Sequence, residues 1–246
     1  MKKITDYKEL SPLIMKYYKR GVLTNCFLSK EDYIAEISEG RLFYKSDDSY
    51  LCLYLLRDGH YQLYFYALDS EVIFPSADMP LICDCVGYED LLKHNGFSKL
   101  ITRTRLEHEG TDGVLNETDI ASVQDATEVH KLMTESFDPI TGYVPTLAQI
   151  KNECENGGIF KIVIDEKLAA VIRPAITKNN VHIRHLCVSK DFRGRGLGGK
   201  LCECVLSHGK RCSVWTGSEN TVALSMYKSF GFKENGLTSV VYRKDV

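Results

Sequence analysis

One short stretch carries the residue types best suited to binding an anion. Residues 191–201 read DFRGRGLGGKL, with four glycines and two arginines. Glycine lets an anion approach backbone N–H groups closely, and arginine adds countercharge. The stretch fits two patterns: G-x-G-x-x-G through Gly194, Gly196 and Gly199, and R-x-x-G-x-G through Arg193, Gly196 and Gly198. The first pattern is typical of dinucleotide binding, and the two patterns lead to different enzymes.

Three features argue against a dinucleotide fold. Residues 189–192 separate the glycines from the apolar strand that ends at Val188, although that fold places its first glycine directly after the strand. Fewer than fifty residues follow Gly199, too few for the strand–helix units still needed. Glu219, the acid at the ribose-binding distance, stands beyond its strand and beside Asn220. A dinucleotide-dependent oxidoreductase is therefore the third interpretation, and a plain surface loop is disfavoured by the clear strand and helix on either side.

The elements around this loop alternate between strands and helices. Apolar runs and capping residues predict strands at 120–123, 159–165, 167–176, 181–189, 212–216 and 238–243, and helices at 125–137, 146–155, 198–208 and 221–230. This alternation predicts an α/β (α+β) fold with a mixed sheet flanked by helices.

The first half repeats part of this pattern. It is predicted to contain helices at 6–20, 30–39 and 88–95 and strands at 50–56, 61–68, 80–86 and 99–106, the first two strands forming a hairpin around Asp58-Gly59. Both YEDLLKHNGFSKL and LSMYKSFGFKEN are short helices that end in Gly-Phe before a strand, which indicates two tandem copies. The polar segment 107–119 is the expected linker, giving domains at 1–110 and 117–246.

The second half resembles the GNAT superfamily of acyl-CoA-dependent N-acyltransferases. The matching motifs are a strand ending in L-x-V at Leu186–Val188, the R-x-x-G-x-G loop, Asn220 with an alanine three residues on, and Tyr227 followed by Gly-Phe. They cover residues 117–246 in order and spacing, whereas the first half shares only the Gly-Phe end and the strand pattern and has no glycine loop. The resemblance implies a mostly antiparallel mixed sheet of the GNAT type, an acetyl-CoA-binding second domain and a degenerate first one.

The resemblance also implies roles for particular residues. Acetyl-CoA would be bound by Leu186, Cys187, Val188, Arg193, Gly194, Arg195, Gly196, Leu197, Gly198, Asn220 and Tyr227. In such a site the Val188 N–H stabilises the oxyanion, and Tyr227 protonates the departing thiolate. A phenol of pKa about 10 can give its proton to the thiolate of a thiol of pKa about 8.5, though without a strong driving force. Two structural alternatives stay open: Asn220 as the cap of helix 221–230, and Tyr227 as a packing residue.

The chain departs from the family pattern at the general base. Many members carry an acid two residues before the leucine of L-x-V, where this chain has Arg184, and an arginine cannot accept a proton at neutral pH. Strand alternation predicts that His182 shares the face of Arg184 and that His185 lies on the other. His182 is thus the candidate proton relay, with a structural role as its alternative. Arg184 instead suits a substrate carboxylate, which favours a zwitterionic acceptor.

Composition limits the partners. With 31 Lys+Arg against 33 Asp+Glu, the net charge of −2 predicts no binding of nucleic acid or anionic membrane. No apolar run of membrane-spanning length and no signal sequence stand out, so we expect a cytoplasmic protein, monomeric or homodimeric. The nine cysteines are expected to be reduced and mostly buried. The pairs Cys83/Cys85 and Cys202/Cys204 lack the spacing of zinc ligands, so no metal is expected.

These observations favour one function and leave a second open. The first is an N-acetyltransferase that moves the acetyl group of acetyl-CoA to a primary amine of a small molecule or peptide, by direct attack in a ternary complex. The second is a non-catalytic acyl-CoA-binding or regulatory protein, because the acidic base is missing and the first half is degenerate.

Overall fold

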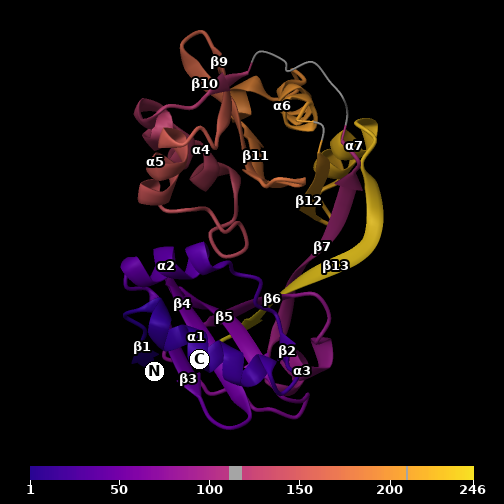
Figure 1. Cartoon of the computed structure of the whole chain (residues 1–246). Coiled ribbons are helices and arrows are strands. Elements are labelled where there is room, and N and C mark those ends of the chain that lie inside the picture. Colours follow the sequence, from indigo (N-terminus) through magenta and orange to yellow (C-terminus); the bar gives the residue numbers. More distant parts are fainter. Residues whose placement is uncertain (111–117, 209) are drawn as a thin grey trace. The chain divides into compact units, whose positions relative to one another are not determined.

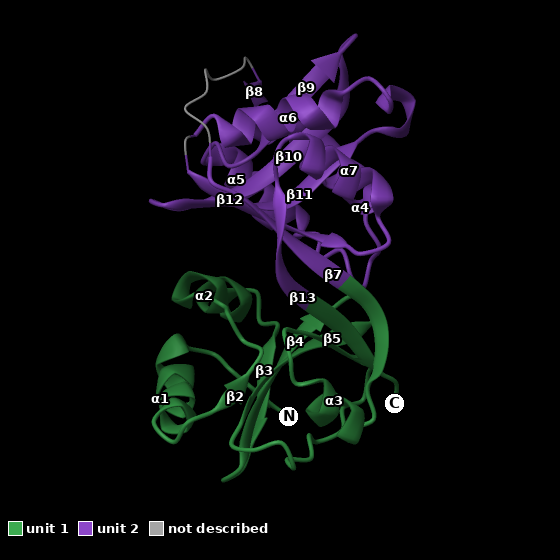
Figure 2. Ribbon diagram, turned by 90° about the vertical axis from the view of Figure 1, so that its right-hand side faces the viewer, with its two compact units in different colours: residues 1–102, 239–246 green, residues 103–238 purple. Residues whose placement is uncertain are grey.

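The computed structural model describes residues 1–110, 118–208 and 210–246, which form two units. Unit 1 comprises residues 1–102 and 239–246, and unit 2 comprises residues 103–238 (Figure 2). Two strands, β7 (Ser98–His108) and β13 (Lys233–Lys244), contribute residues to both units. The units therefore differ from the expected division into 1–110 and 117–246 at residues 103–110 and 239–246. Of the predicted linker 107–119, residues 107–108 belong to β7 and residues 111–117 lie outside the described residues.

Unit 1 has a mixed sheet in the strand order β1-β3-β4-β5-β6-β13, parallel between β5 and β6. Its elements are labelled in Figure 1: β1 (Lys2–Lys3), α1 (Tyr7–Tyr18), β2 (Leu23–Thr24), α2 (Lys30–Ser38), β3 (Leu42–Ser46), β4 (Tyr50–Arg57), β5 (His60–Ala67), β6 (Leu81–Cys85), α3 (Glu89–His94) and parts of β7 and β13. The predicted hairpin is confirmed, since Arg57 pairs with His60 around Asp58-Gly59. β1, β2 and β3 were not predicted, because runs of two to five residues carry too little periodicity.

Both faces of the unit 1 sheet are covered. Helices α1 and α2 bury Leu10, Tyr17 and Tyr33 against one face. Their starts follow from capping: the side chain of Asp6 accepts from Lys8 N–H, and that of Ser29 accepts from Asp32 N–H. On the other face α3 packs together with segment 68–80, which contains no helix or strand.

Unit 2 has a mixed, mostly antiparallel sheet in the order β7-β12-β11-β10-β9-β8, with one parallel pair, β11 and β12. Its elements are β8 (Asp119–Ile120), the 3₁₀ turn η1 (Val123–Asp125), α4 (Ala126–Ser136), α5 (Leu147–Glu155), β9 (Phe160–Ile164), β10 (Lys167–Ile176), β11 (Asn180–Val188), the 3₁₀ turn η2 (Lys190–Phe192), α6 (Leu197–Leu206), β12 (Arg211–Gly217), α7 (Thr221–Ser229) and parts of β7 and β13. The predicted fold class is confirmed for this unit: a mixed sheet flanked by helices.

The helices of unit 2 lie in two layers. α6 and α7 pack on one face, where Leu201, Val205 and Tyr227 contact Val181, Ile183 and Val214. α4 and α5 pack on the other face, where Met133 and Ile150 contact Val171 and Cys187. All nine cysteines of the chain are free and buried, as predicted.

Candidate functional site

The central feature of unit 2 is the place where two parallel strands separate. β11 and β12 pair from Asn180↔Arg211 to Ile183↔Val214, and β11 then continues to Val188 while β12 continues to Gly217 with β7 as its partner. Residues 184–188 therefore present one backbone edge that β12 does not pair with.

The register of β11 shows which backbone groups face this separation. Ser189 N–H bonds to Ala169 O at 2.8 Å, so these two residues form a hydrogen-bonded pair, and the adjacent pair Ala170↔Val188 is the non-bonded kind. The N–H and C=O of Val188 consequently point away from β10, toward the side of β12. This orientation is the one that the predicted role of the Val188 N–H requires.

A bulge in β11 corrects the predicted faces of the histidines. Arg173 pairs with His185 but Pro174 pairs with Ile183, so β11 carries one additional residue, Arg184, at this bulge. Before the bulge Val181 and Ile183 face α6, and after it Leu186 and Val188 face the same side. The alternation is therefore reset at Arg184. His182 and His185 lie on the same face of the sheet, opposite α6, and the prediction that they lie on opposite faces was wrong.

The glycine loop has the conformation of an anion-binding turn. Gly194 and Gly196 have φ of +76° and +73°, a region that favours glycine, and a Cβ added at either would meet no atom within 4 Å. Gly196 directly precedes α6, and the first N–H that bonds within the helix is that of Lys200. The N–H groups of Leu197, Gly198 and Gly199 thus precede the first intrahelical bond and lie at the positive end of the helix dipole, the end of a helix that attracts anions.

The two loop arginines lie close to this turn. Arg193 is exposed, and its Nε donates to Val188 O at 3.3 Å. Arg195 is also exposed, and its guanidinium lies 5.1 Å from the centre of the Phe192 ring. The loop therefore carries two positive charges beside the end of β11.

Two further glycines serve packing rather than conformation. A Cβ on Gly198 would lie 2.9 Å from Met226 Sδ and 3.4 Å from Leu186 Cδ2, and one on Gly199 would lie 2.8 Å from Phe230 Cζ. Both glycines are needed for α6 to approach α7 closely. Gly199, interpreted from the sequence as an ordinary helical residue, is thus sterically constrained.

Tyr227 and Asn220 both lie on or next to α7. Tyr227 is 4% exposed and its ring packs against Phe232 with centroids 5.3 Å apart. Burial raises the pKa of its hydroxyl, with smaller contributions from Cys202 and Cys212, so the phenol stays protonated at neutral pH. Asn220 caps α7, since its Oδ1 accepts from Ala223 N–H at 3.1 Å. The structure thus shows Asn220 as a helix cap and Tyr227 as a packing residue, the two structural alternatives from the sequence. Neither role prevents the residue from contacting a cofactor.

His182 is held in its neutral form. Its Nδ1 lies 3.0 Å from Ser213 Oγ on β12. Burial lowers the pKa of His182 to about 4, helped by the positive charges of Arg184 and Arg105. The imidazole is therefore unprotonated at neutral pH and free to accept a proton, although as a weak base. Arg184 itself is exposed on the bulge.

Sequence reasoning missed a network that anchors the loop after α4. His185 is 5% exposed; its Nε2 donates to Gly142 O at 2.8 Å, and its Nδ1 faces Arg173 Nη1 at 3.4 Å. Arg173 in turn makes two hydrogen bonds to the Glu153 carboxylate. The same loop is bound from β7, where Arg103 donates to Thr141 O. The available signal was Pro174: a proline inside a strand indicates a bulge, and it is this bulge that brings His185 to the face of the loop.

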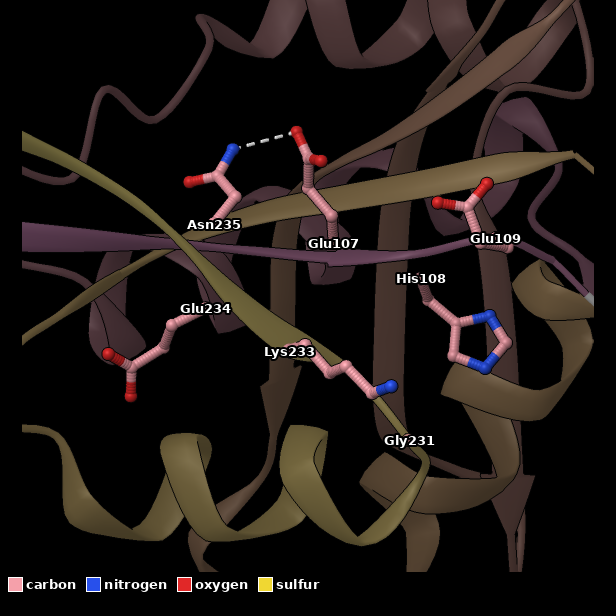
Figure 3. A pocket seen from close by; sticks show the side chains of 7 residues that line it. All are labelled: Glu107, His108, Glu109, Gly231, Lys233, Glu234 and Asn235. Carbon is pink, nitrogen blue, oxygen red and sulfur yellow. Dashed lines mark hydrogen bonds between the residues drawn. The ribbon is translucent and has the colours of Figure 1, made fainter.

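A separate pocket of about 360 Å³ opens at the other end of the unit 2 sheet. It is lined by Glu107, His108, Glu109, Gly231, Lys233, Glu234 and Asn235 (Figure 3). Asn235 donates to Glu107 Oε1 at 2.9 Å, and Glu107 also accepts from Arg211 at 2.7 Å. Glu107 pairs with Ser213 near the start of β12, whereas the glycine loop follows the end of the parallel strand β11. This pocket is therefore not part of the site around Val188.

Two further findings concern metal and membrane. Within residues 1–110, 118–208 and 210–246, no three His, Cys, Asp or Glu side chains are grouped to hold a metal ion. Among the same residues no helix is long and apolar enough to cross a membrane.

Comparison with known proteins identifies the family of the second half. Residues 126–244 match the family model described as acetyltransferase (GNAT) domain. An uncharacterized N-acetyltransferase of Methanocaldococcus jannaschii is 37% identical over 57 residues, which is 21% of this chain and 25% of that protein. The chain therefore spans about a quarter of the length of this curated relative. Residues 126–244 thus match an acetyltransferase (GNAT) domain, in agreement with the sequence resemblance.

Solved structures extend the likeness to the first half. A GNAT-family acetyltransferase of Colwellia psychrerythraea matches 100% of this chain and 99% of its own, with a TM-score of 0.61 and 14% identity. A tandem GNAT protein from the clavulanic acid biosynthesis pathway, solved without acetyl-CoA, matches 82% of this chain and 81% of its own, with a TM-score of 0.57 and 12% identity. At these identities the likeness shows the fold. The chain has the tandem GNAT fold.

Proposed function

We propose that the chain is an acetyl-CoA-dependent N-acetyltransferase acting on a primary amine of a small molecule or peptide by direct attack in a ternary complex. One observation carries the proposal: β11 continues beyond its pairing with β12 and leads to a glycine loop whose left-handed Gly194 and Gly196 precede helix α6. An extended amide-bearing arm and a pyrophosphate would meet these two features in that order.

The residues present suit the parts of coenzyme A. When bound, acetyl-CoA supplies an acetyl group activated as a thioester. The backbone of Leu186–Val188 offers N–H and C=O groups to the two amides of the pantetheine arm, and the open turn at Gly194 and Gly196 accommodates the pyrophosphate. The Val188 N–H is the donor we propose for the acyl oxygen.

Proton transfer falls to two groups in this proposal. Tyr227 is the acid we propose for the leaving thiolate; its hydroxyl is protonated at neutral pH, and because burial raises its pKa it is a weak acid for this step. His182 is neutral, bonded to Ser213 and able to relay a proton from the amine. With a pKa of about 4, His182 is a weak base. We therefore propose that the amine reaches the site already deprotonated and that His182 only relays the proton released on acyl transfer.

We propose that the acceptor carries an anionic group. Arg184 projects from the bulge where the family's acid is commonly found, and a guanidinium there binds a carboxylate instead of accepting a proton. Arg105 also acts on His182 electrostatically, so the positive potential at this face is not due to Arg184 alone. An amino acid or a similar zwitterion fits this arrangement.

One experiment separates this proposal from its alternative, a non-catalytic acyl-CoA-binding protein. Purified chain and acetyl-CoA are incubated with a panel of amines, and release of CoA thiol is followed together with the mass of the acetylated product. Turnover of at least one amine supports the enzyme. Tight acetyl-CoA binding with no turnover across zwitterions, polyamines and peptide N-termini would support the binding protein.

A further inference from the structure

The parallel strands of unit 1 also separate, at the position that corresponds to the site in unit 2. In each unit an antiparallel hairpin is followed by a parallel strand: β4, β5 and β6 in unit 1, and β10, β11 and β12 in unit 2. β5 and β6 pair only at Tyr61↔Leu81 and Gln62↔Ile82. Residues 63–67 of β5 thus correspond to residues 184–188 of β11.

This edge of β5 is occupied by another part of unit 1. The short strand β2 pairs antiparallel with the end of β5, through Leu23↔Ala67 and Thr24↔Tyr66. The hydroxyl of Thr24 also donates to Phe65 O at 2.6 Å. β2 therefore takes over the edge of β5 where β6 has left it.

The side chain of Asn25 fills the remaining separation. It is 4% exposed, and its carboxamide accepts from Phe65 N–H at 2.8 Å and donates to Leu63 O at 3.1 Å and to Asp84 O at 3.0 Å. One amide thereby bridges β5 and β6 by bonding to backbone groups on both sides of the separation. A pantetheine amide offers part of this chemistry, a carbonyl acceptor and one N–H donor where the carboxamide has two.

Neighbouring buried groups fix this segment. Cys26 Sγ lies 2.8 Å from the Tyr33 hydroxyl, which lies 2.8 Å from the Tyr66 hydroxyl. Cys26 N–H also donates to Thr24 Oγ1 at 3.1 Å. In addition, segment 68–80, which stands where unit 2 has the glycine loop and α6, contains no helix whose N-terminus could take a pyrophosphate.

We infer that residues 23–26 are a built-in occupant of the cofactor cleft of unit 1, with the Asn25 carboxamide in the place of a pantetheine amide. The chain then binds one acyl-CoA, in unit 2, and unit 1 is closed to it. This inference rests on the proposed function only for the site in unit 2.

The first test is stoichiometry. Titration of the intact chain with acetyl-CoA, by calorimetry and native mass spectrometry, should give one bound molecule, and Gly196→Asp should bind none. Two molecules on the wild-type chain, or one retained by Gly196→Asp, would overturn the inference.

The second test is chemical rescue: the melting temperature of a variant is measured with and without pantetheine, in the absence of acetyl-CoA. Asn25→Gly removes the carboxamide and should lower the melting temperature by several degrees, and pantetheine should restore part of that loss. Asn95→Gly is the matched control, because Asn95 is equally buried in unit 1 and also bonds to backbone groups, at Val72 O and Leu91 O, but away from the separation. Pantetheine should stabilise it no more than it stabilises the wild-type chain.

Equal stabilisation of the two variants, or of neither, would mean that Asn25 is a polar bridge and not a ligand substitute. Should Asn25→Gly fail to fold, Asn25→Asp keeps the shape and the acceptor but loses both donated bonds, and it is compared with Asn95→Asp in the same way. If the wild-type chain binds no acetyl-CoA at all, the proposed function fails, while the rescue still decides the role of Asn25.

Discussion

Replacing Gly196 by aspartate tests the assignment of the glycine loop, with asparagine at the same position as the matched control. Both residues must adopt φ near +73°, which costs an L-residue about 1–2 kcal/mol and costs Asn and Asp less than most. Neither side chain meets an obstacle at its Cβ, since no atom lies within 4 Å. The two variants should therefore fold alike, with melting temperatures a few degrees below the wild type.

The expected difference between the variants comes from charge alone. Two unit charges about 4 Å apart near a protein surface interact by about 4 kcal/mol, which corresponds to a change of about a thousandfold in Kd. Gly196→Asn should weaken acetyl-CoA binding modestly by crowding, whereas Gly196→Asp should weaken it about a thousandfold further. Because the repulsion is exposed to solvent, the gap between the variants should narrow as salt is raised.

Isothermal titration with acetyl-CoA at low and high salt measures this gap, and differential scanning calorimetry checks the fold. Equal losses in the two variants would show that the position matters sterically and that no anion lies there. A wild-type Kd for Gly196→Asp would remove the glycine loop from the cofactor site altogether.

Tyr227→Phe removes the proposed acid and should lower kcat at least tenfold, while the Kd for acetyl-CoA should not change because the ring packing is kept. An unchanged kcat would leave Tyr227 as a packing residue. Arg184→Ala should raise KM for zwitterionic acceptors more than for those lacking a carboxylate, and identical effects on both would refute an anionic subsite. Gly199→Ala should lower the free energy of unfolding by about 1–3 kcal/mol in urea melts through its contact with Phe230, and no loss would contradict the packing role. Burial lowers the pKa of His185 to about 4, against about 6.5 in the unfolded chain, so the unfolded chain binds more protons between these pH values. The contribution of neutral His185 to the free energy of unfolding, at most about 3 kcal/mol, is therefore complete above pH 6.5 and lost as the pH falls toward 4. His185→Gln should make the free energy of unfolding, measured in urea melts, less dependent on pH in this range.

The local elements of the site could be predicted from sequence, because their signals are local. Gly194 and Gly196 stand between a continuous apolar strand and an amphipathic helix, and the structure gives both the left-handed backbone that such a turn requires. Capping residues such as Ser29 placed helix starts correctly. The mixed sheet was predicted, but the parallel pairing of β11 with β12 was not.

What could not be predicted depends on contacts between distant residues. The bulge at Arg184 arises opposite Pro174, and nothing near Arg184 in the sequence announces the reset of alternation that moves His185 to the face of His182. The anchoring of the loop after α4 joins His185 to Gly142, 43 residues away. Asn25 lies in a short polar break between helices, and its role depends on a separation of strands that only the assembled sheet contains.

The two strand separations differ in which groups hydrogen-bond to the strand edge, and this difference supports the inference that one tandem copy binds acyl-CoA and the other does not. In unit 1 the hairpin of β4 and β5 is regular, with unbroken pairing from Tyr50↔Ala67 to Arg57↔His60, so β5 does not bend away from β6 by itself. Buried backbone groups must be hydrogen-bonded, and there Asn25 and β2 supply those bonds from within the chain.

In unit 2 the irregularity lies in the hairpin itself, because Pro174 has no N–H to pair with and β11 accommodates an extra residue at Arg184. β11 therefore bends where its pairing with β12 ends, and the described residues place only a guanidinium, that of Arg193, on the carbonyl of Val188. A bond of 3.3 Å from an exposed, flexible side chain is readily exchanged for one to a ligand amide, whereas the buried bonds of Asn25 are not. The edge of β11 is thus available to an incoming arm, and the edge of β5 is permanently paired.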